Sequence, residues 1–216
     1  GCFMGQKDFS VTIANMFQQI TKEEESNIQK AAVILAETVM QGGTLYTFGT
    51  GHSMGIAHEA VGKRGSLLKA KLLDEHIYNL ARFERLEGLG PVIMKNHQLT
   101  NKDTVIVASN SGRNPLTIEV AEEAKKQGAK VISISAHDVK GKLPSLKSSG
   151  YYLADYADVA IDNHGDSSDL LLEIPGTDLK VGSPSTLTGI FIYYLILTEA
   201  VEIMVAKGFK PPLIKG

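Results

Sequence analysis

The sequence lacks several features that would assign it to a particular class of protein. Its 216 residues include a single cysteine, Cys2, so an internal disulfide framework is impossible. Lysine plus arginine number 22 and aspartate plus glutamate 24, for a formal net charge of −2. This balance offers neither a nucleic-acid surface nor a polybasic membrane anchor. The longest apolar run, Ile190 to Leu197, is too short to span a bilayer. We therefore predict a cytoplasmic protein without nucleic-acid or membrane partners.

Familiar ligand-binding motifs are also missing. The glycines at 49 and 51 are followed by Met54, where a dinucleotide fingerprint has its third glycine, and no Walker lysine follows. The sequence HEAVG lacks the second histidine of a zinc-binding HExxH, and His52 and His58 are six apart, on different helix faces. Residues 162–166 are rich in oxygen ligands without calcium-loop spacing, and we interpret them as a solvated loop. We therefore expect no metal and no cofactor.

Apolar strands and helices alternate along the rest of the chain. The segment TVIVA is β-branched and apolar throughout, as expected for a strand covered on both faces. Asn114 and Pro115 suit the start of the helix that follows, and Gly128 suits its end. Strands are predicted at residues 45–48, 67–73, 104–108, 131–134 and 159–161. This alternation predicts an α/β fold, a three-layer αβα sandwich around a five-stranded parallel sheet.

The two ends of the chain are predicted to be helical. Thr21 and Glu24 have the spacing of a capping box, which separates a short helix at 8–20 from a second one ending near Gln41. Further helices are expected at 52–62 and at 184–207. Residues 76–102 are ambiguous, because Gly88, Gly90 and Pro91 interrupt a helical pattern. We predict an N-terminal helical segment, 1–43, followed by a single globular unit, 44–216.

Three hydroxyl-rich turns are expected at strand ends or helix starts. They are Gly49–Ser53, Ser109–Asn114 and Gly182–Thr186. Each is expected to offer free backbone N–H groups, the positive end of a helix dipole and hydroxyl donors to an anion. Ordinary helix capping is the competing interpretation for each turn. We favour an anion site at the second turn, because Ser109 and Ser111 supply two hydroxyls before Asn114 could act as the cap.

Two questions about charged residues remain open from sequence. His52 and Glu59 are seven apart, which would put them on one helix face as an acid–base pair. Glu59 and Lys63 are also spaced for a surface ion pair, and His52 could bond only a backbone carbonyl. Arg113 either clamps the anion or faces solvent.

The pattern resembles the SIS (sugar isomerase) domain family. The resemblance rests on FGTGHS after the first strand, on VIVASNSGRNP, and on SPSTLTG before the last helix, and it spans about residues 44–206. It implies a flavodoxin-like sheet, a phosphosugar ligand, and a homodimer or dimer of dimers with shared sites. It further implies that Glu59 lies on the helix that carries a catalytic glutamate in several relatives, although the spacing differs from that of phosphoheptose isomerases.

The pattern indicates an anion site, and the resemblance implies a phosphosugar-binding protein that is expected to be an aldose–ketose isomerase. Glu59 and His52 are the expected catalytic residues, with a histidine from the partner subunit as the alternative to His52. The alternatives are a non-catalytic sugar-phosphate sensor and an etherase or lyase acting on an amino-sugar phosphate. The sugar itself is not specified. The expected ligand-binding residues all lie in the three turns: Gly51, Ser53, Ser109, Asn110, Ser111, Arg113, Ser185 and Thr186.

Overall fold

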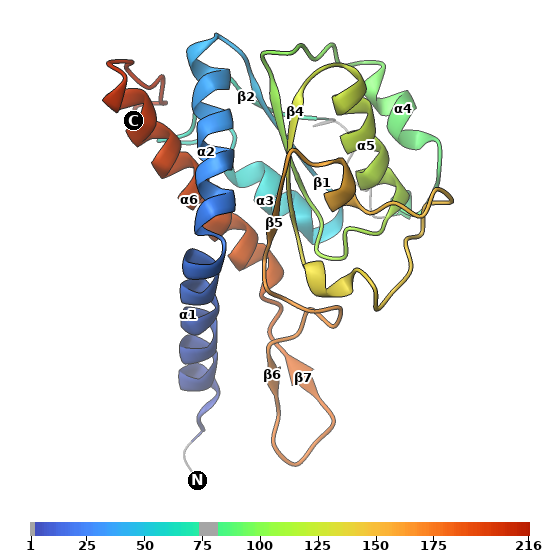
Figure 1. Ribbon diagram of the computed structural model, residues 1–216. Helices are drawn as coiled ribbons and strands as arrows, with labels where there is room; N and C mark the ends of the chain where they lie inside the picture. The colour runs from blue at the N-terminus through green and yellow to red at the C-terminus, as the bar shows by residue number, and fades with distance from the viewer. Residues whose placement is uncertain (1–2, 74–81) are drawn as a thin grey trace.

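A computed structural model describes residues 3–73 and 82–216 of the chain (Figure 1). Cys2 and the first part of the ambiguous segment, residues 76–81, lie outside these ranges. The strands are β1 (Leu45–Gly49), β2 (Ala70–Leu72), β3 (Thr104–Ala108), β4 (Lys130–Ser135), β5 (Val159–Asp162), β6 (Leu172–Glu173) and β7 (Lys180–Val181). The α-helices are α1 (Gly5–Glu23), α2 (Glu25–Met40), α3 (Met54–Glu59), α4 (Leu89–Met94), α5 (Pro115–Lys126) and α6 (Ser185–Ala206). Short 3-10 helices are η1 (Gly51–Ser53), η3 (His137–Val139) and η4 (Leu153–Tyr156).

The five predicted strands form one parallel sheet in the order β2-β1-β3-β4-β5. This confirms the predicted α/β fold with its five-stranded, flavodoxin-like sheet. The order reverses between β1 and β3: β2 lies beside β1 on one side of this parallel pair, and β4 and β5 follow β3 on the other side. We call this place the switch point. Gly49, the last residue of β1, pairs with Ala108, the last residue of β3, so the turns that follow the two strands are neighbours.

Alternate side chains of the strands enter two separate hydrophobic cores. Ile106 and Ala108 belong to the core under α2, α3 and α6, whereas Val105 and Val107 belong to the core under α4 and α5. The three layers are visible in Figure 1, with α2 and α6 on one side of the sheet and α5 on the other. Helix α3, after β1, and helix α5, after β3, therefore cover opposite faces, as the reversal of strand order requires.

The predicted capping box at Thr21 is wrong. Thr21 lies inside α1, and its hydroxyl donates to the carbonyl of Phe17 one turn back at 2.9 Å. The break between α1 and α2 falls at Glu24, whose backbone leaves the helical region. Glu24 is also buried, and its carboxylate accepts hydrogen bonds from Asp162 and lies against His164. A contact distant in sequence therefore fixes the break, and a local pattern could not reveal it.

Three local predictions need smaller corrections. The helix expected at 52–62 is a 3-10 turn followed by a short α-helix, so His52 lies outside α3. The weak second strand is reduced to Ala70–Leu72. Gly88 and Pro91 start a helix rather than break one: Gly88 precedes α4 with φ 93°, and Pro91 lies in its first turn, where no N–H is needed. Residues 82–102 thus contain a short helix.

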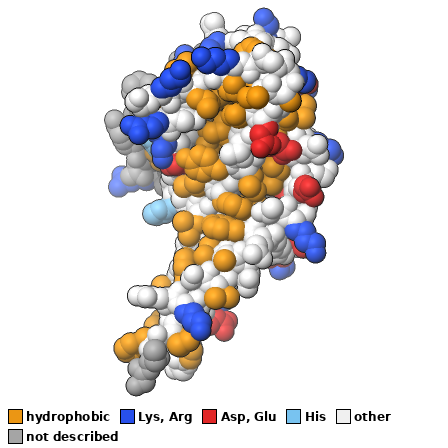
Figure 2. All heavy atoms as spheres, turned by 90° about the vertical axis from the view of Figure 1, so that its left-hand side faces the viewer, with side chains coloured by type: hydrophobic (Ala, Val, Ile, Leu, Met, Phe, Trp, Pro, Cys, Tyr) orange, Lys and Arg blue, Asp and Glu red, His pale blue; other side chains and the backbone are white. Residues whose placement is uncertain are grey.

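Helix α6 is apolar on every side but is covered only in part. Within the described residues it alone has the length and composition to cross a membrane, and 39% of its apolar window is buried. Its inner face packs on α2 and α3 as a core helix does. Its outer face leaves Leu187, Tyr194 and Val205 exposed, and Phe191 stacks on Phe17 of α1. Figure 2 shows hydrophobic side chains gathered in a long stripe on this side of the molecule.

Candidate functional site

The first turn, Gly49–Ser53, is built on two glycines for steric reasons. A Cβ on Gly49 would lie 2.4 Å from the carbonyl oxygen of Ser53, and Gly51 has φ 58°, which favours glycine. The hydroxyl of Thr50 is buried and donates to Glu84 at 2.7 Å. The hydroxyl of Ser53 is half-buried and has no hydrogen-bond partner among the described residues. Gly51 and Ser53 therefore present a backbone turn and one available hydroxyl at the end of β1.

In the second turn, Ser109–Asn114, two serine hydroxyl groups are available as hydrogen-bond donors to a ligand. The Ser109 oxygen accepts the N–H of Gly112 at 3.1 Å, and the Ser111 oxygen accepts the N–H of Arg113 at 3.4 Å. Gly112 closes the turn with φ 61°. Because both oxygens act as acceptors here, each hydroxyl proton can still be donated to a ligand. Asn114 makes no side-chain cap to α5, so the capping interpretation fails at this turn.

Asn110 and Arg113 tie this turn to other loops. Asn110 accepts a hydrogen bond from the side chain of Asn163 at 3.0 Å and donates to the carbonyl of Asp166 at 3.2 Å. The Arg113 side chain is half-buried, and its Nε donates to the carbonyl of Pro144 at 2.8 Å. Arg113 is therefore not a freely solvated arginine, and its role as an anion clamp stays a prediction.

At the third turn, the start of α6 is occupied by a carboxylate of the same chain. Asp169 accepts hydrogen bonds from the hydroxyls of Ser183 and Ser185, at 2.7 and 2.6 Å, and from the N–H of Ser185 at 3.2 Å. Thr186 lies beside α3, since a Cβ on Gly55 would come 3.2 Å from its methyl group. An anion binding at Ser185 would have to share this place with Asp169. Asp169 could not be recognised as a cap from the sequence, because it lies sixteen residues before Ser185, the first residue of the helix.

Glu59 makes the ion pair that its spacing allowed. Its Oε1 lies 2.7 Å from Lys63 Nζ and accepts the hydroxyl of Tyr194 at 2.5 Å. The hydrogen bond from Lys63, followed by that from Tyr194, lowers the pKa of Glu59 below its ordinary value. The side chain is 24% exposed. His52 is exposed in the 3-10 turn before α3, so it does not share a face of that helix with Glu59 as predicted.

The first and second turns are neighbours at the switch point, and Glu84 contacts residues on both sides of it. Its side chain binds Thr50 of the first turn, and its carbonyl accepts the N–H of Leu116 in the first turn of α5 at 3.0 Å. In open α/β sheets, ligands bind outside the carboxyl ends of strands at such a point. Glu84 was missed because the sequence of residues 76–102 carries no clear pattern and no motif.

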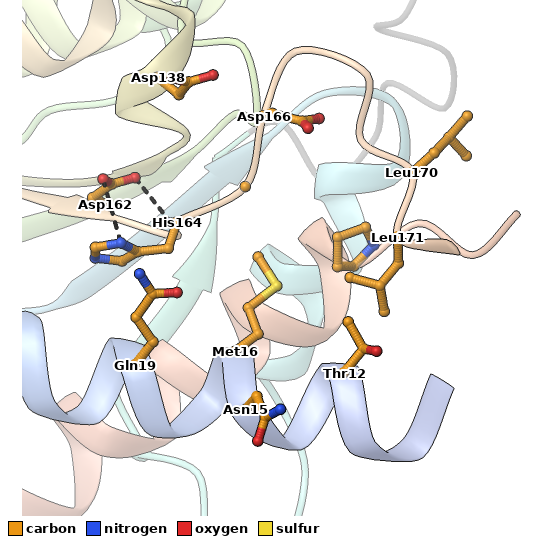
Figure 3. Close-up of a pocket in the computed structure, with 12 residues that line it drawn as sticks. Thr12, Asn15, Met16, Gln19, Asp138, Asp162, His164, Asp166, Leu170 and Leu171 are labelled. Atoms are coloured by element: carbon orange, nitrogen blue, oxygen red, sulfur yellow. Dashed lines mark hydrogen bonds and ion pairs between the residues drawn. The ribbon is translucent and has the colours of Figure 1, made fainter. Parts of the chain in front are cut away.

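A cavity of about 670 Å³ lies beside this site, between α1 and the loop after β5 (Figure 3). Met16 and Gln19 point from α1 toward Asp162 at the end of β5 and toward the loop that carries His164 and Asp166. The interpretation of residues 162–166 as a solvated loop holds for Asp166, which is exposed, but not for Asn163, which is buried, and Asp162 and His164 are half-buried.

His164 holds this loop to the joint between α1 and α2. Its Nε2 lies 3.0 Å from Glu24, and its Nδ1 lies 3.4 Å from Glu23 and 3.9 Å from Asp162. The N–H of Asp162 also binds Glu24 at 3.1 Å. The described residues contain no group of three or more His, Cys, Asp or Glu side chains suited to holding a metal ion.

Known proteins resemble this chain in both sequence and fold. The sequence model of a family described as the SIS domain matches residues 8–136. A UPF0309 protein of Halalkalibacterium halodurans is 34% identical over 216 residues, which cover 97% of this chain and 89% of that protein.

Two solved structures extend the comparison to the fold. Phosphoheptose isomerase from Neisseria gonorrhoeae has a TM-score of 0.63 at 16% identity and covers 90% of this chain and 95% of its own. A phosphoheptose isomerase from Francisella tularensis has a TM-score of 0.62 at 15% identity, covering 91% and 96%. At these low sequence identities, the two comparisons show a similarity of fold alone.

Proposed function

The chain belongs to the SIS domain family, and on that basis we propose that it binds a sugar phosphate at the switch point. The phosphate would lie at the second turn, against Ser109 and Ser111, at the N-terminus of α5. The observation that carries this proposal is the geometry of that turn. Two serine hydroxyls with free protons stand next to the positive end of a helix dipole, an arrangement suited to an anion.

Further residues of the three turns would complete the site. Gly51 and Ser53 follow the end of β1, which pairs with the end of β3, and Asn110 fixes the second turn to the loop after β5. Arg113 would complete the anion cradle. Ser185 would reach the sugar only if Asp169 moves away from it, whereas Thr186 could contact a ligand that approaches from its own side.

For chemistry, the proposal is interconversion of an aldose and a ketose phosphate. Glu59 would move a proton between adjacent carbons through an enediol, and His52 would serve the carbonyl and hydroxyl oxygens. The fold shared with two phosphoheptose isomerases supports this reaction class.

A non-catalytic sensor of sugar phosphates is the second candidate, and one observation favours it. Glu59 is paired with Lys63 and Tyr194, which lowers its pKa and makes it a weaker base. A sensor would need the phosphate turn without a base.

The test of the proposal is a thermal-shift panel of sugar phosphates against the same sugars without phosphate. A true ligand at a hundredfold excess over its dissociation constant adds about 2.7 kcal/mol to the free energy of unfolding. We expect stabilisation by phosphorylated sugars alone, followed by an assay of the best ligands for turnover. Equal shifts with both sets of sugars, or none at all, would exclude a phosphosugar site. Binding without turnover would favour the sensor.

We further propose that the protein is at least a homodimer, and that the outer face of α6 lies in the interface. The exposed Leu187, Tyr194 and Val205 on this helix would then be covered by a second copy. Tyr194 also binds Glu59, so the interface would adjoin the proposed base. A dimer of dimers and a cytoplasmic location remain predictions.

A further inference from the structure

Glu84 is a carboxylate held at the switch point from two sides. Its Oε2 accepts the buried Thr50 hydroxyl at 2.7 Å, which ties the side chain to the first turn. Its carbonyl accepts the N–H of Leu116 at 3.0 Å, which ties the backbone to the helix that follows the second turn. The residue is half-buried. Its carboxylate therefore lies between the turn that ends β1 and the start of α5.

The charge of Glu84 is not neutralised by a partner in the described part of the chain. No lysine, arginine or histidine there comes within ion-pair distance of it, and its second oxygen, Oε1, accepts no hydrogen bond from the described residues. The neighbouring carboxylates differ: Glu59 is paired with Lys63, and Glu87 with Lys147 and Ser148. A carboxylate with a free oxygen accepts hydrogen bonds from hydroxyl groups and repels a second anion.

We propose that Glu84 determines which sugar phosphates the site accepts, by contacting the sugar end of the ligand. The carboxylate accepts hydrogen bonds from sugar hydroxyls while the phosphate lies at Ser109 and Ser111. It thereby selects ligands whose only anionic group is the phosphate, and it rejects phosphorylated sugar acids and sugar bisphosphates. This inference rests on the proposed function, because it requires the phosphate to bind at the second turn.

The experiment compares two ligands that differ in one charge. The sugar phosphate that stabilises the protein most is titrated by calorimetry beside the phosphorylated aldonic acid of the same chain length, with inorganic phosphate as the reference. The wild type is expected to bind the sugar phosphate more tightly than the other two. In Glu84→Gln, which keeps an acceptor for Thr50, the preference for the sugar phosphate over the acid should fall by about tenfold or more, equivalent to about 1.4 kcal/mol.

Two further variants make the comparison specific. Glu87→Gln removes the same charge three residues away, on a side chain that binds Ser148, and should leave the preference unchanged. Glu84→Asp keeps the charge and should keep the rejection of the acid, even if Glu84→Gln folds poorly. Melting curves establish that each variant is folded.

The outcomes separate this inference from the proposed function. An unchanged preference in Glu84→Gln, together with weakened binding of all three phosphates in Ser111→Ala, would overturn the role of Glu84 and leave the phosphate site standing. A wild type that binds none of the three phosphates would overturn both. A tenfold loss of preference in Glu84→Gln but not in Glu87→Gln supports the inference.

Discussion

At the scale of single residues, the site depends on which polar groups are left with something to donate or accept. Ser109 and Ser111 accept backbone hydrogen bonds and keep their protons for a ligand. Ser185 donates its proton to Asp169 instead, so it offers much less to an anion. Serines in these turns therefore differ in their capacity to donate a hydrogen bond to a ligand, because their neighbours differ.

The first prediction concerns Ser111. We expect Ser111→Ala to weaken binding of a sugar phosphate by about 1–3 kcal/mol, because the phosphate loses one donor of its cradle. Isothermal calorimetry on the folded variant measures this. Ser167→Ala removes an exposed hydroxyl in the loop after β5 and serves as the control, with unchanged affinity. A Ser111→Ala variant that binds as tightly as the wild type would exclude Ser111 from the site.

The second prediction concerns Glu59 as the base. Glu59→Gln keeps the size of the side chain but cannot accept a proton, so turnover should fall by about a hundredfold or more with near-normal binding. Exchange of solvent deuterium into the substrate should disappear with it. If Glu59 instead serves only the surface ion pair with Lys63, the variant loses well under about 1 kcal/mol of stability and keeps its turnover.

The pH dependence gives an independent check on the same residue. Lys63 and Tyr194 lower the pKa of Glu59 from 4.5, so the carboxylate stays ionised at mildly acidic pH. We expect the acid limb of kcat/KM to lie below that value. A limb near neutral pH would assign the base to another group.

At the scale of elements, the start of α6 is capped from a distance. Asp169 lies in the segment before the β6–β7 hairpin, and its carboxylate takes the cap position that Pro184 cannot fill with its own side chain. The same segment contains His164, which joins it to the break between α1 and α2. The two helices at the ends of the chain are thus held by one loop.

The third prediction tests this cap. Asp169→Ala should lower the free energy of unfolding by about 0.5–2 kcal/mol, the usual range for loss of an N-cap, and more so at low salt because the carboxylate also meets the helix dipole. Denaturant titration measures it. Asp178→Asn, in the exposed hairpin, is the control. Equal stabilities would show that Asp169 contributes no net capping energy.

At the scale of the whole molecule, the outer face of α6 carries the prediction about assembly. Val205 is 60% exposed on α6, and Val92 is 56% exposed on α4, on the opposite side of the sheet. We expect Val205→Asp to shift the protein toward monomer in light scattering at micromolar concentration, because it places a charge in an apolar interface. Val92→Asp should leave the mass unchanged. A wild type that is already monomeric would contradict the dimer and weaken the idea of a shared site.

The sequence by itself determined the fold class and the location of the Ser109–Asn114 turn between β3 and α5. Both follow from short-range rules: β-branched runs such as TVIVA form buried strands, and glycine with serine after them forms a turn at a helix start. Parallel strands align their carboxyl ends, so the first two turns could be expected at one edge of the sheet, whereas their being neighbours follows from the observed strand order.

Only the tertiary structure decided which polar groups in those turns are hydrogen-bonded within the protein and which can bind a ligand. Glu84 contacts Thr50 across thirty-four residues, and Glu24 contacts His164 across a hundred and forty. Such contacts leave no periodic pattern in the sequence, because any loop that returns to the edge of the sheet can place a carboxylate there. Whether Glu59 acts as a base or only as an ion-pair partner likewise depends on a distant residue. Tyr194 of α6 reaches Glu59 because α6 packs on α3. Local sequence forms the turns, and the packing of distant elements decides which of their polar groups remain free for a ligand.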